Sequence, residues 1–538
     1  MDFSYAISLV LEAHTPFVRE FRKEDNLSQT GEEGRFFESV SETLLPLLGV
    51  FDRLESDHIP FRMGLAISPI LCNMLNDEHL QKKYLYYTDK QIEFGKQEIE
   101  RTAGHGELNK LAENYYNQLL DKRIAYTERY ENNLLKAFDF YRRKGRVEIL
   151  ASNATHAFLP FISNNSESLQ AQLEIPVSAY RRYFGSSPQG FWLPALGWTP
   201  AIEPYLRAYN YTYTIVDSHS LLYGRPLPQK GSFFPVKTPN GTFILARDFN
   251  TVREIEQITN NDVYRDNDRD VGYELPPEIV SPFLSTEGER RRTGYKYWKH
   301  IADAASHQRS EAQDTIYNPQ AASDRVIEHA RLFIEKAIAR LEEASKHMME
   351  APLSLYAHNA DNFGRFWYEG PQFIEALFRL AAGYRDFRFV NPSEYIFNQN
   401  LSLFQTVAPE VSSWGINGYA ETWLNTSNDW IYRHLARSME RMTELAERFP
   451  DDTGLKERAL NQAAREILLA QSSDWPGLLY RQDSTEYARC QAENALRNFT
   501  TIYEALGSNY ISTEWLTTLE RHHNLFPNIN YRVFRRKK

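Results

Sequence analysis

An alternation of short apolar runs with helical patterns, over the first two-thirds of the chain, limits the fold more than any other sequence feature. This alternation is typical of a parallel β-sheet wrapped by helices. The runs with the length of buried strands are Tyr5–Leu11, Arg62–Ile67, Val147–Ser152, Gly190–Leu193, Tyr211–Val216, Ser354–Asn359 and Phe387–Val390. These runs are enough to close a barrel, so the sequence predicts an α/β barrel whose active residues lie at the C-terminal strand ends.

Two long segments interrupt the alternation, and a third follows it. The first is a helical pair, Glu78–Arg101 and Leu108–Arg142. The second is polar and irregular apart from one hairpin, Phe233–Val236 with Phe243–Ala246, and we expect it to cover the barrel mouth as a binding loop. From about residue 400 the patterns are only helical. The predicted boundaries are 1–398 for the barrel domain, within it 76–143 for a helical insertion and 222–320 for the cleft-covering loops, and 399–538 for a C-terminal helical domain that contributes to the cleft.

Charge and cysteine content exclude several classes of protein. The net charge of −10 argues against a general nucleic-acid binder. No run of about 18 uninterrupted apolar residues occurs, so we predict no membrane-spanning helix. The chain has only Cys72 and Cys490 and starts without the basic region of a signal peptide, which favours the cytoplasm. It has no Gly-rich phosphate loop, no His-Glu-x-x-His motif and no Cys-x-x-Cys pair, so we predict no cofactor and no metal.

Histidines and tryptophans gather where a saccharide site is expected. The expected strand ends carry His14, His156, His219 and His358. Aromatic residues make up 14% of the chain, and several tryptophans stand within two residues of Asn, Asp or Ser, a pairing that can both stack on a sugar and hydrogen-bond it. For any single cluster, a buried Trp with a satisfied polar neighbour is the alternative interpretation. Together, the clusters and the histidines favour a saccharide cleft.

Five segments, in a fixed order, carry a resemblance to a known family. They are Leu9–Arg19, Gly145–Pro160, Trp192–Trp198, His358–Pro371 and Leu468–Pro476. In this order they resemble the motifs of glycoside hydrolase family 57, and in particular of its α-1,4-glucan branching enzymes, along essentially the whole chain. The resemblance implies a distorted (β/α)7 barrel with a helical insertion and a C-terminal all-helical domain, and it implies α-glucan or a maltooligosaccharide as the ligand.

The two catalytic positions of the family are substituted in this chain. Ala195 stands where the family has its nucleophilic Glu, in Trp-Leu-Pro-Glu-Cys-Gly-Tyr, and Asn359 stands where the family has its acid/base Asp. The resemblance implies a retaining mechanism, which needs two carboxyl groups about 5–5.5 Å apart. Alanine has no lone pair for attack, and an amide does not exchange a proton as a carboxyl group does. The sequence therefore predicts an inactive, α-glucan-binding pseudoenzyme of glycogen or starch metabolism.

Two alternatives remain open. An active branching enzyme or transglycosylase would use relocated carboxylates, Glu12 with Asp361 or Asp474. An interaction scaffold would instead bind another glycogen enzyme as its protein partner. The resemblance also implies a set of substrate-binding residues: His14, His156, Trp298, Trp414, Trp423 and Asp474.

Overall fold

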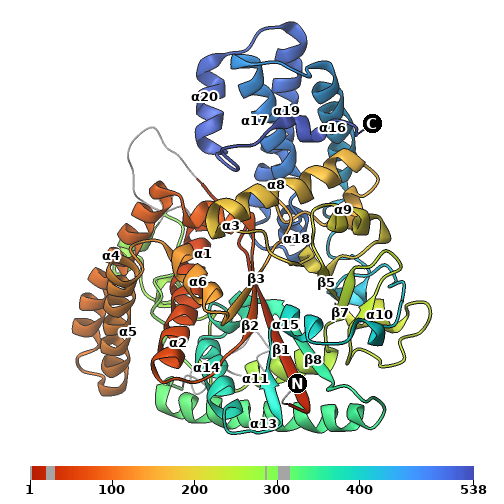
Figure 1. The fold of residues 1–538 in the computed structure, drawn as a ribbon. Helices are drawn as coiled ribbons and strands as arrows, with labels where there is room; N and C mark the ends of the chain where they lie inside the picture. The colour runs from red at the N-terminus through yellow and green to blue at the C-terminus, as the bar shows by residue number, and fades with distance from the viewer. Residues whose placement is uncertain (1–2, 20–30, 285–287, 301–314, 538) are drawn as a thin grey trace.

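The computed structural model describes residues 3–19, 31–284, 288–300 and 315–537 (Figure 1). Its centre holds two sheets, one with the strand order β3-β2-β1-β8 and the other with the order β4-β5-β7-β6. The strands are β1 Tyr5–Ala13, β2 Met63–Ile67, β3 Val147–Leu150, β4 Gly190–Phe191, β5 Tyr213–Val216, β6 Val236–Lys237, β7 Phe243–Ala246, β8 Leu353–Asn359 and β9 Phe387–Phe389. All neighbouring strands are parallel except β6 and β7.

Main-chain contacts join the two sheets into a distorted barrel. A parallel bridge between Ala151 and Phe191 connects the end of β3 to β4. On the other side, the N–H of Asp248, just after β7, donates to the carbonyl of Leu355 on β8 at 2.7 Å. Strands β8, β1, β2, β3, β4, β5 and β7 therefore surround one interior as the (β/α)7 barrel that was predicted. Among the described residues, β7 and β8 are not paired along their length, and this gap in the hydrogen bonding makes the barrel irregular.

The seventh barrel strand is β7, and here the prediction from the sequence was wrong. The expected hairpin exists, because β6 pairs with β7 in antiparallel fashion, but β7 also pairs in parallel with β5. All four residues of β7 are buried, as is usual for a strand covered on both faces. The run Phe387–Val390, which was expected in the barrel, forms β9 and pairs only with Tyr5–Ile7 at the start of β1.

Side chains fill the interior of the barrel. Small residues such as Ala6, Ala66 and Ala357 face large ones such as Trp192 and Tyr213, and all of these are fully buried. Interiors packed in this way leave no pore along the barrel axis. A ligand therefore has access only to the open end, where the strands finish.

Helices cover the outside of the barrel and form its connections (Figure 1). Several begin with a side-chain cap: the oxygen of Ser68 accepts from Leu71 N in α3, and that of Asn318 accepts from the N–H groups of Gln320 and Ala321 in α13. The helices around the barrel, capped or not, are α1 Gly31–Ser39, α2 Leu45–Ser56, α3 Pro69–Leu75, α7 Leu159–Ile162, α8 Ser166–Phe184, α9 Glu203–Ala208, α10 Ser218–Leu222, α11 Phe249–Thr259, α12 Val271–Glu274, α13 Pro319–Ser345, α14 Gly370–Ala381 and α15 Pro392–Phe397. A π-helical turn, η1 Val40–Leu44, joins α1 to α2.

The helical insertion stands beside the barrel as the pair α4 Glu78–Thr102 and α5 Gly106–Ile124, at the left of Figure 1. The π-helical turn η2 Ala125–Arg129 and helix α6 Leu134–Arg143 follow it, so the second expected helix is broken. Glu131 and Asn132 have φ angles of 50° and 58°, in the left-handed region that ends a helix. The side-chain oxygen of Asn133 accepts from Lys136 N and caps α6 after this break, which the apolar spacing did not show.

The C-terminal part is all-helical, as the sequence predicted, and gathers at the top of Figure 1. Its helices are α16 Asp429–Arg448, α17 Gly454–Ala470, α18 Asp474–Arg481, α19 Thr485–Ser508 and α20 Thr513–His522. Among the described residues, no helix combines the length and the apolar character that a membrane span needs. The polar region 222–320 is described only in part: residues 285–287 and 301–314 of it lie outside the described ranges.

Candidate functional site

Polar side chains from several strands meet at the open end of the barrel. Glu12 on β1 and Asn359 on β8 are register partners, so both side chains leave the sheet on the same face. Ser68 follows β2, Asp217 follows β5 and Arg247 follows β7. Because the strands are parallel, all these residues lie at one end of the barrel, as the sequence predicted for its active residues.

Two stacked histidines form the centre of this site. The rings of His14 and His156 lie 3.7 Å apart between centroids and 7° from parallel. Each ring has its own carboxylate: His14 Nε2 lies 3.0 Å from Asp474 Oδ1, and His156 Nε2 lies 2.9 Å from Glu12 Oε1. Asp474 begins helix α18, so the C-terminal helices supply one of the four groups. The structure thus brings together Glu12, His14, His156 and Asp474.

Serine hydroxyls hold the other nitrogen of each ring. His14 Nδ1 lies 2.8 Å from the hydroxyl of Ser68, and His156 Nδ1 lies 3.0 Å from that of Ser473. The hydroxyl of Ser472 also donates to Asp474 at 2.8 Å. With both nitrogens engaged, each ring is fixed in orientation. These serines were not predicted, because a hydroxyl next to a strand end or helix start carries no distinctive sequence signal.

The charges of the four groups support one another. Burial alone would lower the pKa of His156, but the charge and the hydrogen bond of Glu12, together with the charge of Asp474, raise that pKa above its ordinary value. Burial opposes ionisation of Asp474, yet the charge of His14 lowers the pKa of the Asp474 carboxyl to about 2. At neutral pH, Asp474 is therefore ionised and serves as a hydrogen-bond acceptor.

Three of these groups also have the composition of a metal site. His14, His156 and Asp474 each offer a ligand atom, and these atoms lie within 4.8 Å of one another. The lone pair of an imidazole lies in the plane of its ring, but a cation placed between two parallel rings would lie out of both planes. In this arrangement the cluster acts as a hydrogen-bonded ion-pair network, and the absence of a metal remains a prediction.

Ala195 lies in a strained turn after β4. Its φ and ψ are 56° and 19°, and the next residue, Leu196, also has a positive φ of 49°. The left-handed region costs a residue with a Cβ roughly 1–2 kcal/mol. The methyl group is buried against Phe158 and Trp423, and the Ala195 carbonyl accepts from Trp414 N at 2.8 Å. The position at which the sequence predicts the family nucleophile thus holds a buried methyl group.

The amide of Asn359 is engaged in local structure. Its side-chain oxygen accepts from Asp361 N at 2.8 Å and so caps the short helical turn η7 Ala360–Phe363. The carboxylate of Asp361 is turned the other way: it accepts from Ser39 and Thr43 on the α1–η1 side, at 2.7 and 2.8 Å. The contacts of Asp361 are therefore separate from the histidine cluster, in which Glu12 lies.

The tryptophans expected to bind sugar differ in their surroundings. Trp414 is half-buried, stacked on His358 at 5.3 Å, with the guanidinium of Arg247 5.5 Å from its ring centre. Trp423 is buried and stacked on Phe158 at 5.0 Å, which also suits a packing role. Trp298 donates to Glu274 at 2.7 Å, and both belong to the 222–320 region. Trp414 and Trp423 thus flank Ala195, whereas the contacts of Trp298 lie outside the cluster.

Arg247, Asp217 and His358 form a second polar group at the barrel mouth, and the sequence did not predict that Arg247 belongs to it. The guanidinium of Arg247 forms a short hydrogen bond with Asp217, and both residues are buried. Burial, and then the positive charge of Arg247, lower the pKa of the neighbouring His358 to about 3, so this histidine is neutral. Arg247 escaped notice because β7, which carries it to the mouth, was assigned only to a hairpin.

Comparison with known proteins places these observations in a family. Residues 8–406 match glycosyl hydrolase family 57, and residues 434–534 match the C-terminal region of 1,4-alpha-glucan branching enzyme. The 1,4-alpha-glucan branching enzyme TK1436 of Thermococcus kodakarensis is 26% identical over 504 residues, which cover 90% of this chain and 71% of that protein.

Solved structures agree with this assignment. The alpha-amylase AmyC from Thermotoga maritima is 32% identical over the full length of both chains, with a TM-score of 0.90. The GH57-type branching enzyme from Pyrococcus horikoshii, 23% identical over all of this chain and 98% of its own, shares the fold with a TM-score of 0.87. On the extent of the family match and the likeness to AmyC, the chain belongs to glycosyl hydrolase family 57.

Proposed function

We propose that this protein binds α-glucan at the barrel mouth and does not cleave it. One observation carries the proposal: both positions that hold the catalytic carboxylates in the resembled enzymes are without one. Ala195 presents a buried methyl group, and Asn359 presents an amide whose oxygen caps a helical turn. A double displacement needs a nucleophile and a proton donor, and neither of these side chains supplies one.

Binding is supported by the polar and aromatic groups that surround these two positions. His14 and His156 hold the Asp474 carboxylate in a fixed orientation, and its oxygens have further lone pairs that can accept from sugar hydroxyls. Trp414 offers an aromatic ring beside them, next to the cationic group of Arg247. A ring with polar neighbours suits a saccharide, which has apolar faces and hydroxylated edges. We infer that the site keeps affinity for maltooligosaccharides.

A second candidate function rests on Glu12. This carboxylate is 1% exposed, lies beside Asn359 in register, and is paired with a histidine whose pKa is raised. Those features would suit a relocated nucleophile or acid, so an active branching enzyme or transglycosylase is the alternative. The partner carboxylate would be Asp474, because Asp361 Oδ1 accepts from Ser39 and Thr43 and Asp361 Oδ2 lies 3.6 Å from Arg365 Nη1.

Replacement of Trp414 by alanine is expected to weaken the binding of maltoheptaose by roughly tenfold, because the site loses an aromatic ring. Isothermal titration calorimetry measures the effect. Trp515→Ala, on α20 and away from the mouth, is the matched control and should leave affinity unchanged. No heat with maltoheptaose and no retardation in glycogen affinity gels would refute the proposed function.

We also propose the domain boundaries, the cytoplasmic location and the protein partner that the sequence predicts. The boundary between barrel and C-terminal domain at 398/399 is supported by the change to helices, and the two family matches leave 407–433 between them. A cytoplasmic location is supported by the two free cysteines, Cys72 and Cys490. A glycogen-metabolism protein partner is a prediction that co-purification tests.

A further inference from the structure

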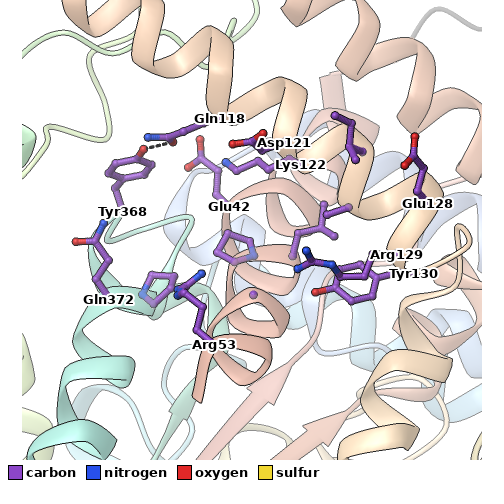
Figure 2. A pocket seen from close by; sticks show the side chains of 16 residues that line it. Glu42, Arg53, Gln118, Asp121, Lys122, Glu128, Arg129, Tyr130, Tyr368 and Gln372 are labelled. Atoms are coloured by element: carbon purple, nitrogen blue, oxygen red, sulfur yellow. Dashed lines mark hydrogen bonds between the residues drawn. The ribbon is translucent and has the colours of Figure 1, made fainter. Parts of the chain in front are cut away.

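A cavity of about 810 Å³ opens between the η1–α2 segment and the helix α5 with η2, and it shares no lining residue with the barrel mouth (Figure 2). Amide and phenol groups line its inner side, where the hydroxyl of Tyr368 bonds to Gln118. Figure 2 shows Glu42 and Lys122 pointing toward one another at this inner end. The volume is that of a small-molecule site.

The inner end of the cavity has more positive than negative groups. Glu42 accepts from Arg265 Nη2 at 3.2 Å. Lys122 and Lys296 act on the same carboxylate from further away, and within the described residues neither has a hydrogen-bond acceptor or a carboxylate at ion-pair distance. Three cations thus face one carboxylate, an excess of two positive charges.

Other nearby carboxylates balance this excess only in part. Arg292, a fourth cation near Glu42, is offset by Glu38 at 3.6 Å. Glu369 lies on the other side of Arg265, where its carboxylate accepts from the Arg265 backbone N–H at 3.1 Å, and burial raises the pKa of this carboxyl. At the outer rim, Arg53 and Arg129 are paired with Glu375 and Asp52, and the remaining acids, Asp121 and Glu128, are exposed.

Another buried lysine, Lys83, forms an ion pair with a carboxylate and can be compared with Lys296. Lys83, which is 3% exposed, lies 2.8 Å from both carboxylate oxygens of the fully buried Glu33. Lys296 is even less exposed, at 1%, and has no such partner in the part of the chain that the structure describes. Buried charges are normally paired, because an unpaired one loses its hydration without compensation. The described carboxylates around Lys122 and Lys296 therefore do not pair with either lysine as Glu33 pairs with Lys83.

We propose that this cavity binds a sugar phosphate, a ligand separate from the glucan of the barrel mouth. Its dianionic phosphate group lies against Lys122, within the positive field of Arg265 and Lys296. A phosphate accepts several charge-assisted hydrogen bonds, and its negative charge complements the excess of positive charge at this end of the cavity. Gln118 and Gln372, with the hydroxyl of Tyr368, face the rest of the ligand and suit sugar hydroxyls. Arg265 covers one face of the Tyr368 ring at 3.7 Å, so that face is closed to a stacked nucleobase.

Isothermal titration calorimetry of the full chain with glucose 6-phosphate, glucose 1-phosphate, inorganic phosphate and glucose tests the proposal. Lys122→Met should weaken sugar-phosphate binding by about tenfold or more, because a charge-assisted bond is lost. Glu42→Gln should tighten it, because the competing negative charge is removed. Lys110→Met, an exposed lysine on the same helix, is the matched control and should change nothing. The opposite signs of the first two variants separate a phosphate site from general loss of structure.

Proton uptake gives a second readout. Burial, with repulsion from Arg265 and Lys296, lowers the pKa of Lys122 to about 8, and a bound dianion would raise it again. At pH 8, the binding heat should therefore vary with the ionisation enthalpy of the buffer in the wild type and much less in Lys122→Met.

Sugar-phosphate binding that Lys122→Met leaves intact, or no binding at millimolar concentration, would overturn the proposal. Equal affinity for inorganic phosphate would overturn its sugar part. Trp414→Ala changes only the barrel mouth, so it should leave sugar-phosphate binding unchanged. Maltoheptaose binding therefore tests the glucan proposal independently of the sugar-phosphate proposal.

Discussion

The wild-type protein, incubated with amylose, is expected to leave both the iodine stain and the number of reducing ends unchanged. In the proposed function, Ala195 and Asn359 stand at the two positions where a retaining mechanism needs carboxyl groups. By analogy with deletions of other catalytic nucleophiles, the loss of the nucleophile alone lowers the rate by about 10⁴–10⁶. A reducing-sugar assay with a parallel branching assay measures the effect.

The matched gain-of-function variant carries Ala195→Glu with Asn359→Asp. It is expected to raise the rate at least about 100-fold over the wild type, the smaller end of the usual contribution of acid–base catalysis. Each single substitution should stay near the wild-type rate, because the mechanism needs both groups. Turnover in the wild-type protein that disappears in Glu12→Gln would contradict the proposed loss of activity and would favour relocated carboxylates.

Substitution of Asp474 by alanine is expected to lower the free energy of unfolding by about 2–3 kcal/mol, the usual value of charged hydrogen bonds at a buried site. Asp474 accepts from His14 of β1 and from Ser472, so its carboxylate ties helix α18 to the barrel. Urea unfolding followed by fluorescence measures the change. Asp451→Ala, an exposed aspartate in the same region, is the control and should have little effect.

The stabilisation by Asp474 should also depend on pH in a defined direction. The folded-state pKa of about 2 lies below the ordinary value of 3.8, so the stabilisation is fully present above pH 4 and is lost as the pH falls toward 2. The difference in free energy of unfolding between the wild type and Asp474→Asn should shrink by about 2 kcal/mol between pH 5 and pH 2. A difference that stays constant from pH 5 to pH 2 would show that the carboxylate is not held by His14.

Much of the barrel could be predicted because the strands are fully buried runs between helices, and this pattern is local. Tyr5–Leu11 and Ser354–Asn359 were recognised in this way and form β1 and β8. The one error in the barrel concerned β7, where a turn signal before Phe243 correctly indicated a hairpin. The additional parallel pairing with β5 joins residues about thirty positions apart, and no local pattern encodes such a pairing.

The candidate site divides in the same way. From the sequence, and from the motifs that it shares with a family, the types of residue at the strand ends were known, including the absence of a carboxylate at Ala195 and Asn359. The sequence did not show which side chains these residues contact in the folded protein. The stack of His14 on His156 closes a separation of 142 positions, and the bond from His14 to Asp474 closes one of 460.

The amino-acid sequence by itself determined which chemical groups this protein has at the barrel mouth, because covalent identity and strand periodicity are local properties. Only the tertiary structure decided which of these groups meet. Glu12 faces His156, Asp361 faces Ser39, and the lysines of the second cavity face a single carboxylate. The reason is physical: contacts between distant segments follow from how the whole core packs, and side-chain charges are balanced only where that packing brings opposite groups together.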